Sequence, residues 1–193
     1  METLEIKKPL TGTTIDPLIQ KRWSPRAFSQ ELIPEETMNS IFTAASWAPS
    51  AMNEQPWQYI YAERGTPAFD RLWDCLVEGN QPWTKDAAVI FVALYNRYYE
   101  RNGRVNRNAA HDLGMANAQL LLQAASQDVY GHILGGFDAD QLIDTLELSD
   151  DQVPFCMGVL GYLGNPDDLE EPYRSRERAK RSRKELNEFV TKL

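Results

Sequence analysis

Four polar, turn-rich segments of this sequence carry residues that can bind a ligand. The first, residues 21–28 (KRWSPRAF), places Arg22, Ser24 and Arg26 around one turn. Two guanidinium groups and a hydroxyl can give charge-assisted hydrogen bonds to a phosphate and to the polar edge of a ring. A basic turn is more often simply solvated, so this segment alone identifies no ligand.

The second segment, residues 48–57 (APSAMNEQPW), places Pro49, Ser50 and Asn53 in a loop stiffened by two prolines. Such a loop suits a preorganised set of hydrogen-bonding groups beside an apolar wall, although an ordinary helix-to-strand connection explains it equally well. The third segment, residues 131–137 (GHILGGF), contains Gly135 and Gly136. Their N–H groups can approach a ligand closely or can form a plain turn.

The fourth segment, residues 174–184, has seven basic residues and one acidic residue, and it includes Arg181 and Arg183. In an acidic protein this composition is typical of a solvated helix face, a nucleic-acid patch or an anion clamp. The acidic residues at 167, 168, 170 and 171 argue against a free arm that binds polyanions. A module that binds anions or nucleic acid through this tail nevertheless stays open as an alternative.

Common catalytic and metal-binding motifs are absent from the sequence. It has no G-x-S-x-G elbow, no Walker loop and no H-E-x-x-H motif. The glycines at 158, 161 and 164 lie within a strand pattern and do not open a helix, which argues against a dinucleotide fingerprint. Cys75 and Cys156 lie far apart in apolar stretches, and two histidines supply no zinc-ligand spacing. We therefore expect reduced core cysteines and no metal.

Length and charge narrow the class of protein. A chain of 193 residues suits a single domain over residues 1–193, and a net charge of -8 argues against a dedicated nucleic-acid binder. The amino terminus has no apolar stretch typical of a signal peptide, and the longest apolar runs are too short to cross a bilayer. We expect a cytoplasmic protein that does not bind membranes.

Hydrophobic periodicity predicts the elements that position these segments. Strands are expected at 57–62, 87–95 and 152–163, and Trp47 and Trp73 are expected in the core. Helices are expected at 17–22, 34–48, around 69–76, 108–128 and 138–148, with an amphipathic closing segment through Leu186, Phe189, Val190 and Leu193. This order predicts an α+β domain or a three-layer α/β domain.

The order of the four segments resembles the nitroreductase family of FMN flavoproteins. The resemblance runs from about Pro17 to the carboxyl end, and A-P-S-x-x-N-x-Q-P-W is its most specific part. It implies a central, mostly antiparallel sheet flanked by helices, and an intertwined homodimer with two FMN molecules at the interface. Asn80 matches a ring-contacting asparagine, whereas Trp83 stands near the place of a lysine in some relatives, with Lys85 two residues on.

The resemblance also implies the roles of individual residues. Arg22, Trp23, Ser24 and Arg26 would contact flavin and phosphate, and Pro49, Ser50 and Asn53 would reach the FMN held mainly by the other subunit. Gly135 and Gly136 would offer N–H groups near N5 and O4 of the ring, and Arg181 and Arg183 would complete the phosphate clamp.

The implied activity is hydride transfer from NADH or NADPH through flavin N5 to a small oxidised acceptor, such as a nitroaromatic, a quinone or an enone, in a ping-pong cycle. Hydride transfer needs no side-chain acid or base, and Arg26 would stabilise the reduced ring electrostatically. Two alternatives are a non-catalytic or regulatory FMN-binding protein and a flavin-destructase or dehalogenase relative on the same scaffold. The connection 95–108 is the best candidate for a lid.

Overall fold

A four-stranded antiparallel sheet forms the centre of the computed structural model, which describes residue 7 and residues 14–193. The strands lie in the order β1-β2-β4-β3, and each neighbouring pair is antiparallel. Their bounds are β1 (Trp57–Glu63), β2 (Val89–Asn96), β3 (Tyr130–Leu134) and β4 (Gln152–Gly161). The predicted mostly antiparallel sheet is confirmed.

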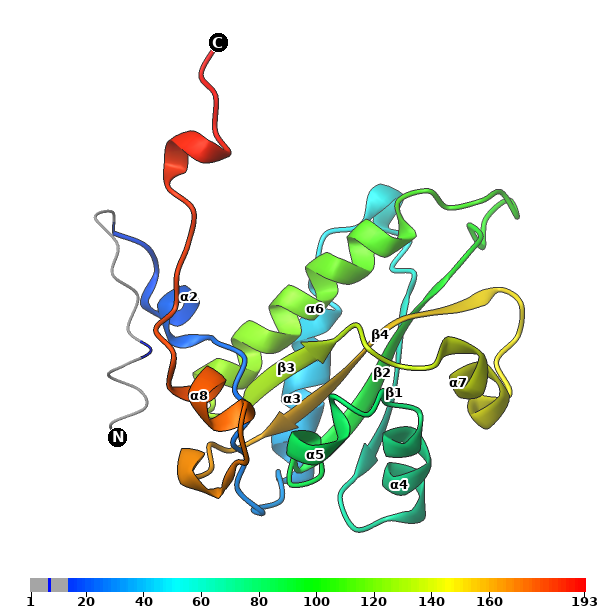
Figure 1. The fold of residues 1–193 in the computed structure, drawn as a ribbon. Helices are drawn as coiled ribbons and strands as arrows, with labels where there is room; N and C mark the ends of the chain where they lie inside the picture. The colour runs from blue at the N-terminus through cyan, green and yellow to red at the C-terminus, as the bar shows by residue number, and fades with distance from the viewer. Residues whose placement is uncertain (1–6, 8–13) are drawn as a thin grey trace.

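Helices cover both faces of the sheet, as Figure 1 shows. One face packs against α3 (Glu35–Ala45) and α6 (Ala109–Ser126); the other packs against α4 (Pro67–Asp74), α5 (Gln81–Thr84) and α7 (Ala139–Leu146). Alternate residues of a strand point to opposite faces, so Phe91 of β2 packs in the first core and Val92 in the second. The continuously apolar run of β2 serves both cores, and the predicted three layers are confirmed.

Two glycines let neighbouring layers approach closely. A Cβ at Gly131 of β3 would lie 2.4 Å from Cδ2 of Leu121 on α6, and a Cβ at Gly158 of β4 would lie 2.3 Å from Cζ of Phe91. Gly158 is the cross-strand partner of Phe91, whose ring is completely buried. The first core therefore uses the space that these glycines leave.

The strand β3 was not expected from the sequence. Its five residues include Gly131, and paired glycines follow it, so the segment has the composition of a turn. Within the described part of the chain, β3 pairs with β4 alone, at the edge of the sheet, and it also contacts α6. These contacts define the segment as a strand and not as a loop. The glycine turn itself is present but begins only at Gly135, after the strand.

The apolar side chains of the closing segment do not form a buried stripe. A 3-10 turn, η3 (Leu186–Glu188), replaces the expected amphipathic element, and Leu186 and Phe189 are each 66% exposed. Figure 1 shows this tail leaving the body of the molecule beyond α8 (Tyr173–Arg178). Trp47 is also 81% exposed, because it lies beyond the end of α3 and not on its buried side. The expectation that Trp47 lies in the core was wrong.

Three short elements complete the chain: α2 (Pro17–Lys21), η1 (Ala51–Asn53) and η2 (Pro166–Asp168). Within residue 7 and residues 14–193, no helix has the length and apolar character needed to cross a bilayer.

We predict that Gly158→Ala destabilises the protein, because the new methyl group would overlap a ring that has no free space to move into. Overpacking of this kind costs about 2 kcal/mol, measurable as the free energy of unfolding in urea. Gly79→Ala is the control, since a Cβ there meets nothing within 4 Å. Equal stability of the two variants would contradict the close packing of β4 on Phe91.

Candidate cofactor site

The turn after α2 is fixed at both of its ends. Asp16 caps α2 through a hydrogen bond from the Leu18 N–H, and the helix ends where Arg22 becomes extended. Further along, the Ser29 N–H donates to the Tyr162 carbonyl, which ties the segment to the end of β4. Residues 22–27 are therefore held against the edge of the sheet on which β3 lies.

Three arginines from the first and fourth polar segments meet at this turn. The Arg181 guanidinium donates to the carbonyls of Arg22 (2.8 Å) and Gln20 (2.6 Å). Burial lowers the pKa of both Arg22 and Arg181, and nearby Arg183 lowers each further. Within the part of the chain that the structure describes, no carboxylate lies at ion-pair distance from these three guanidinium groups. The structure thus brings together cations from residues about 160 positions apart, with no counter-ion contributed by the described residues.

Two buried donors beside these arginines have no acceptor among residue 7 and residues 14–193. They are Nε of Arg181 and Nε1 of Trp23, a side chain that is 4% exposed and packs edge-on against Tyr130. Buried donors are nearly always hydrogen-bonded in proteins, and crowded guanidinium groups favour an anion with several acceptor oxygens. The phosphate of FMN fits this donor set. Ser24 lies half-buried on the same turn.

Arg26 begins a second group of residues. Its guanidinium lies 5.5 Å from the centroid of the Trp83 ring, which in turn lies 4.6 Å from the centroid of the His132 ring. Trp83 is buried, whereas Lys85 is exposed. A guanidinium over an indole face is stabilised by a cation–π interaction, so Trp83 supports Arg26 at the place where some relatives have a lysine.

His132 is neutral at ordinary pH, and its tautomer follows from its one strong contact. Its Nδ1 lies 2.8 Å from the Pro25 carbonyl oxygen, and because a carbonyl can only accept, Nδ1 carries the proton. Burial lowers the pKa of His132 to about 4; the bond to Pro25 opposes this effect, and the charge of Arg26 adds to it. Nε2 is therefore a free acceptor rather than a proton donor.

Asn80 and the glycine pair, which the resemblance assigned to the flavin ring, are neighbours in the structure. The Asn80 amide donates to the Gly136 carbonyl at 2.9 Å. A Cβ at Gly136 would lie 2.8 Å from Nδ2 of Asn80, whereas a Cβ at Gly135 would meet nothing within 4 Å. Gly136 is needed for the approach of Asn80, and Gly135 faces open space.

The structure does not bring Pro49, Ser50 and Asn53 to this group within one chain. The buried carboxylate of Asp112, in the first turn of α6, accepts from the Ala51 N–H at 3.0 Å, so this loop lies at the start of α6. The arginine turn lies near the other end, where Lys21 pairs with Asp128 just beyond α6. An 18-residue helix is about 27 Å long, so the two groups are separated by about that length.

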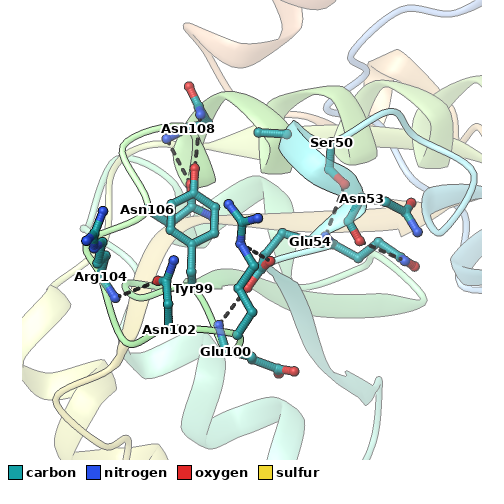
Figure 2. Close-up of polar contacts among 12 residues, drawn as sticks. Ser50, Asn53, Glu54, Tyr99, Glu100, Asn102, Arg104, Asn106 and Asn108 are labelled. Carbon is teal, nitrogen blue, oxygen red and sulfur yellow. Dashed lines mark hydrogen bonds and ion pairs between the residues drawn. The ribbon is translucent and has the colours of Figure 1, made fainter.

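The loop at 50–54 is joined to a hairpin that the sequence indicated as a candidate lid. The Glu54 carboxylate accepts from the Glu100 backbone N–H at 2.6 Å, a contact that Figure 2 marks with a dashed line. The hairpin is closed by the bridge between Tyr98 and Val105. A cavity of about 580 Å³ lies at its base, between the hairpin and the ends of β1, β2 and β4.

A sequence model described as the nitroreductase family matches residues 19–76 and 62–162. The chain belongs to the nitroreductase family. The solved structure of an oxidoreductase containing FMN superposes with a TM-score of 0.89 at 29% identity, over 96% of this chain and 94% of that one. This likeness confirms the predicted nitroreductase fold.

Three further relatives bear on this family member. A putative NADH dehydrogenase/NAD(P)H nitroreductase of Methanothermobacter thermautotrophicus is 25% identical over 179 residues, 89% of this chain and 91% of its own length. Nitroreductase NfnB of Mycolicibacterium smegmatis is 42% identical over 73 residues, 35% of this chain but only 30% of NfnB. A putative nitroreductase in complex with FMN from Desulfovibrio desulfuricans shares the fold, with a TM-score of 0.73 at 22% identity, over 93% of this chain and 98% of that one.

Sequence reasoning did not assign a role to Glu177, which the structure places against the arginine turn. Glu177 is 1% exposed and accepts from the Arg26 N–H. The available signal was its position as the one acidic residue in the basic tail. Among residue 7 and residues 14–193, no three His, Cys, Asp or Glu side chains are grouped to hold a metal.

We predict that His132 makes the nitroreductase lose stability below neutral pH. An unfolded histidine takes up a proton near pH 6.5, whereas native His132 stays neutral down to about 4. The unfolded chain therefore binds the proton first, and the free energy of unfolding falls by on the order of 2–3 kcal/mol as pH drops through this window.

The matched variant is His132→Asn, whose amide can donate to Pro25 in place of Nδ1 but cannot titrate. Urea unfolding at pH 7.5 and 4.5 should show that the free energy of unfolding falls less for this variant than for the wild type. Parallel losses would exclude His132 as the titrating group.

Proposed function

We propose that this protein is an FMN-dependent oxidoreductase that oxidises NADH or NADPH and reduces a small acceptor. The observation that carries the proposal is the arginine group: half-buried Arg22 and Arg181 lie beside exposed Arg183, and among the described residues two buried donors there have no partner and no carboxylate forms an ion pair. A charge arrangement of this kind is unfavourable unless an anion binds there. Membership of the nitroreductase family and the likeness to an oxidoreductase containing FMN support FMN as that anion.

The proposed binding roles divide along the site. Arg22, Arg181 and Arg183 hold the phosphate, with Trp23 offering its indole N–H. Asn80 and the N–H of exposed Gly135 meet the polar edge of the ring. Because guanidinium and amide donors are already fixed by backbone bonds, little ordering remains to be done when the cofactor binds.

Bound FMN supplies the hydride-accepting and hydride-donating ring. The residues of the chain supply position and charge: Arg26, held over Trp83, presents a positive charge toward the ring site. His132, whose pKa is lowered to about 4, stays neutral and moves no proton at pH 7. The acceptor we propose is a planar oxidised molecule such as a nitroaromatic, a quinone or an enone.

We also propose a homodimer in which each cofactor site takes residues from both chains. Ser50 and Asn53 lie at the opposite end of α6 from Arg22, about 27 Å away by helix length, so they can serve only a site on a second copy. The exposed apolar residues of the tail and Trp47 are consistent with surfaces that a second copy covers.

A non-catalytic FMN-binding protein is the second candidate, because every donor described here serves binding. Reduction decides between the two: an enzyme is bleached at 450 nm by NADH or NADPH without oxygen, whereas a passive binder is bleached only by a chemical reductant such as dithionite.

We predict that Arg181→Ala weakens FMN binding by about tenfold or more, since hydrogen bonds to charged groups contribute about 1.5–3 kcal/mol. Quenching of flavin fluorescence in a titration of apoprotein measures the dissociation constant. Arg178→Ala is the control, because Arg178 is exposed and pairs with Asp167 on the surface. If both variants bind FMN as the wild type does, Arg181 is not part of the site.

We predict that two inactive variants restore activity when their subunits are mixed. Arg22→Ala breaks the site on its own chain and Asn53→Ala breaks the site on the partner, so each pure dimer has two damaged sites. A mixed dimer has one doubly damaged site and one intact site. Refolding an equal mixture should therefore recover about a quarter of wild-type activity, by random pairing of subunits. No recovery in mixed dimers would contradict a site shared between chains.

A further inference from the structure

Glu177 is a buried carboxylate in the middle of a basic segment. It lies in the last turn of α8 (Tyr173–Arg178) and is the only residue of that helix that is buried. It is also the one acidic residue between 174 and 184. Its Oε2 accepts from the Arg26 N–H at 2.8 Å, across 151 positions of sequence. The tail therefore contacts the arginine turn through a carboxylate and not only through its basic side chains.

Three separate segments of the chain meet at Glu177. Burial raises the pKa of its carboxyl group, and the backbone N–H groups of Arg26 and Ala27 and the charge of Lys7 lower it. The Lys7 ammonium donates to the Ala179 carbonyl at 2.5 Å and lies 4.7 Å from the centroid of the Trp23 ring. Glu177 is thus at the junction of Lys7, the arginine turn and α8.

The donors of Glu177 are main-chain groups, which makes its effect positional. A buried carboxylate is unfavourable unless it accepts hydrogen bonds, and a buried backbone N–H is unfavourable without an acceptor. Each therefore fixes the other: the turn can leave its place only by exposing the Arg26 N–H and the carboxylate together. Arg181 adds a second link, because it donates to the Arg22 carbonyl in the same turn.

The charge of Glu177 cannot explain its presence at the site. A carboxylate beside Arg26 offsets the positive charge that an anionic cofactor would need, so it does not attract the cofactor. The hydrogen bond that Glu177 accepts from the turn is therefore the property that explains its place at the site.

We propose that Glu177 is a positioning residue of the cofactor site: by accepting from the Arg26 backbone N–H, it fixes the turn from which Arg22 and Arg26 reach the cofactor. This inference rests on the proposed function, because it takes the turn to be part of an FMN site. The affinity for FMN then depends on whether α8 keeps Glu177 in contact with the turn.

Two substitutions separate geometry from charge. Glu177→Gln keeps an acceptor oxygen for the turn and removes the charge; Glu177→Ala removes both. We expect the FMN dissociation constant to stay within about threefold for Glu177→Gln and to rise by about tenfold or more for Glu177→Ala. Glu170→Ala is the matched control, because Glu170 is exposed and precedes the same helix. Equal weakening by the Gln and Ala variants would overturn the positional role.

A double-mutant cycle with Arg26→Ala tests whether Glu177 acts through the turn. If it does, Arg26→Ala should weaken FMN binding in the wild type but change it by less than about twofold in the Glu177→Ala background. A purely structural loss would leave the factor for Arg26→Ala the same in both backgrounds, and that result would overturn the inference. Urea unfolding of each apoprotein, run in parallel, identifies any variant that has lost its fold.

Glu177→Asp replaces Glu177→Ala if the alanine variant does not fold. The shorter side chain withdraws the carboxylate by one methylene, and we expect weaker FMN binding at near-native stability; unchanged binding would overturn the inference. Wild-type apoprotein that binds no FMN would sink the proposed function and this inference together. If the wild-type apoprotein binds FMN but the effects of Glu177→Ala and Arg26→Ala are additive, this inference alone is wrong.

Discussion

The packing of α6 against the sheet is the constraint on which the rest of the molecule depends. The helix lies close to β3 because Gly131 has no side chain to hold Leu121 away. Its first turn carries Asp112, which binds the 50–54 loop, and its far end leads into Asp128, which pairs with Lys21. One rigid element thus sets the positions of both groups of polar residues and the distance between them.

Electrostatics explains why a protein with a net charge of -8 gathers arginines at one turn. Arg22 and Arg181 are partly removed from water, and each lies near another guanidinium group, so the pKa of each is lowered. Among the described residues no carboxylate forms an ion pair with either side chain, and the hydrogen bonds of the Arg181 guanidinium go to backbone carbonyls. This arrangement is the physical basis of the affinity for an anion that we propose.

Local sequence patterns predicted most of the helices and strands, but they did not predict the elements that depend on contacts between distant residues. The long helix was predictable because its apolar residues repeat at helical spacing over many turns. β3 was not, since a five-residue strand with a glycine has a turn-like composition and is defined by its pairing with β4. Trp47 was misplaced because periodicity was extended past the end of α3.

The candidate site shows the same division. The residue types around Arg22 and Asn53 specified charge and hydrogen bonding but left a solvated turn and an ordinary connection open, and the ligand class was predicted only from the resemblance of the ordered motifs to the nitroreductase family. Glu177 escaped notice because its role comes from burial, which a sequence segment of seven basic residues and one acidic residue does not reveal. A residue of this kind becomes visible only when the three-dimensional neighbours are known.

The course of the tail has a practical consequence for handling this protein. A version shortened to end before Glu177 would deprive the Arg26 amide of its acceptor, and it would also remove the Arg181 guanidinium from the Arg22 carbonyl. Both losses fall on a turn near the opposite end of the sequence. Deletions that trim the carboxyl end would therefore remove two hydrogen bonds that hold the amino-terminal turn, and purification tags are better attached elsewhere.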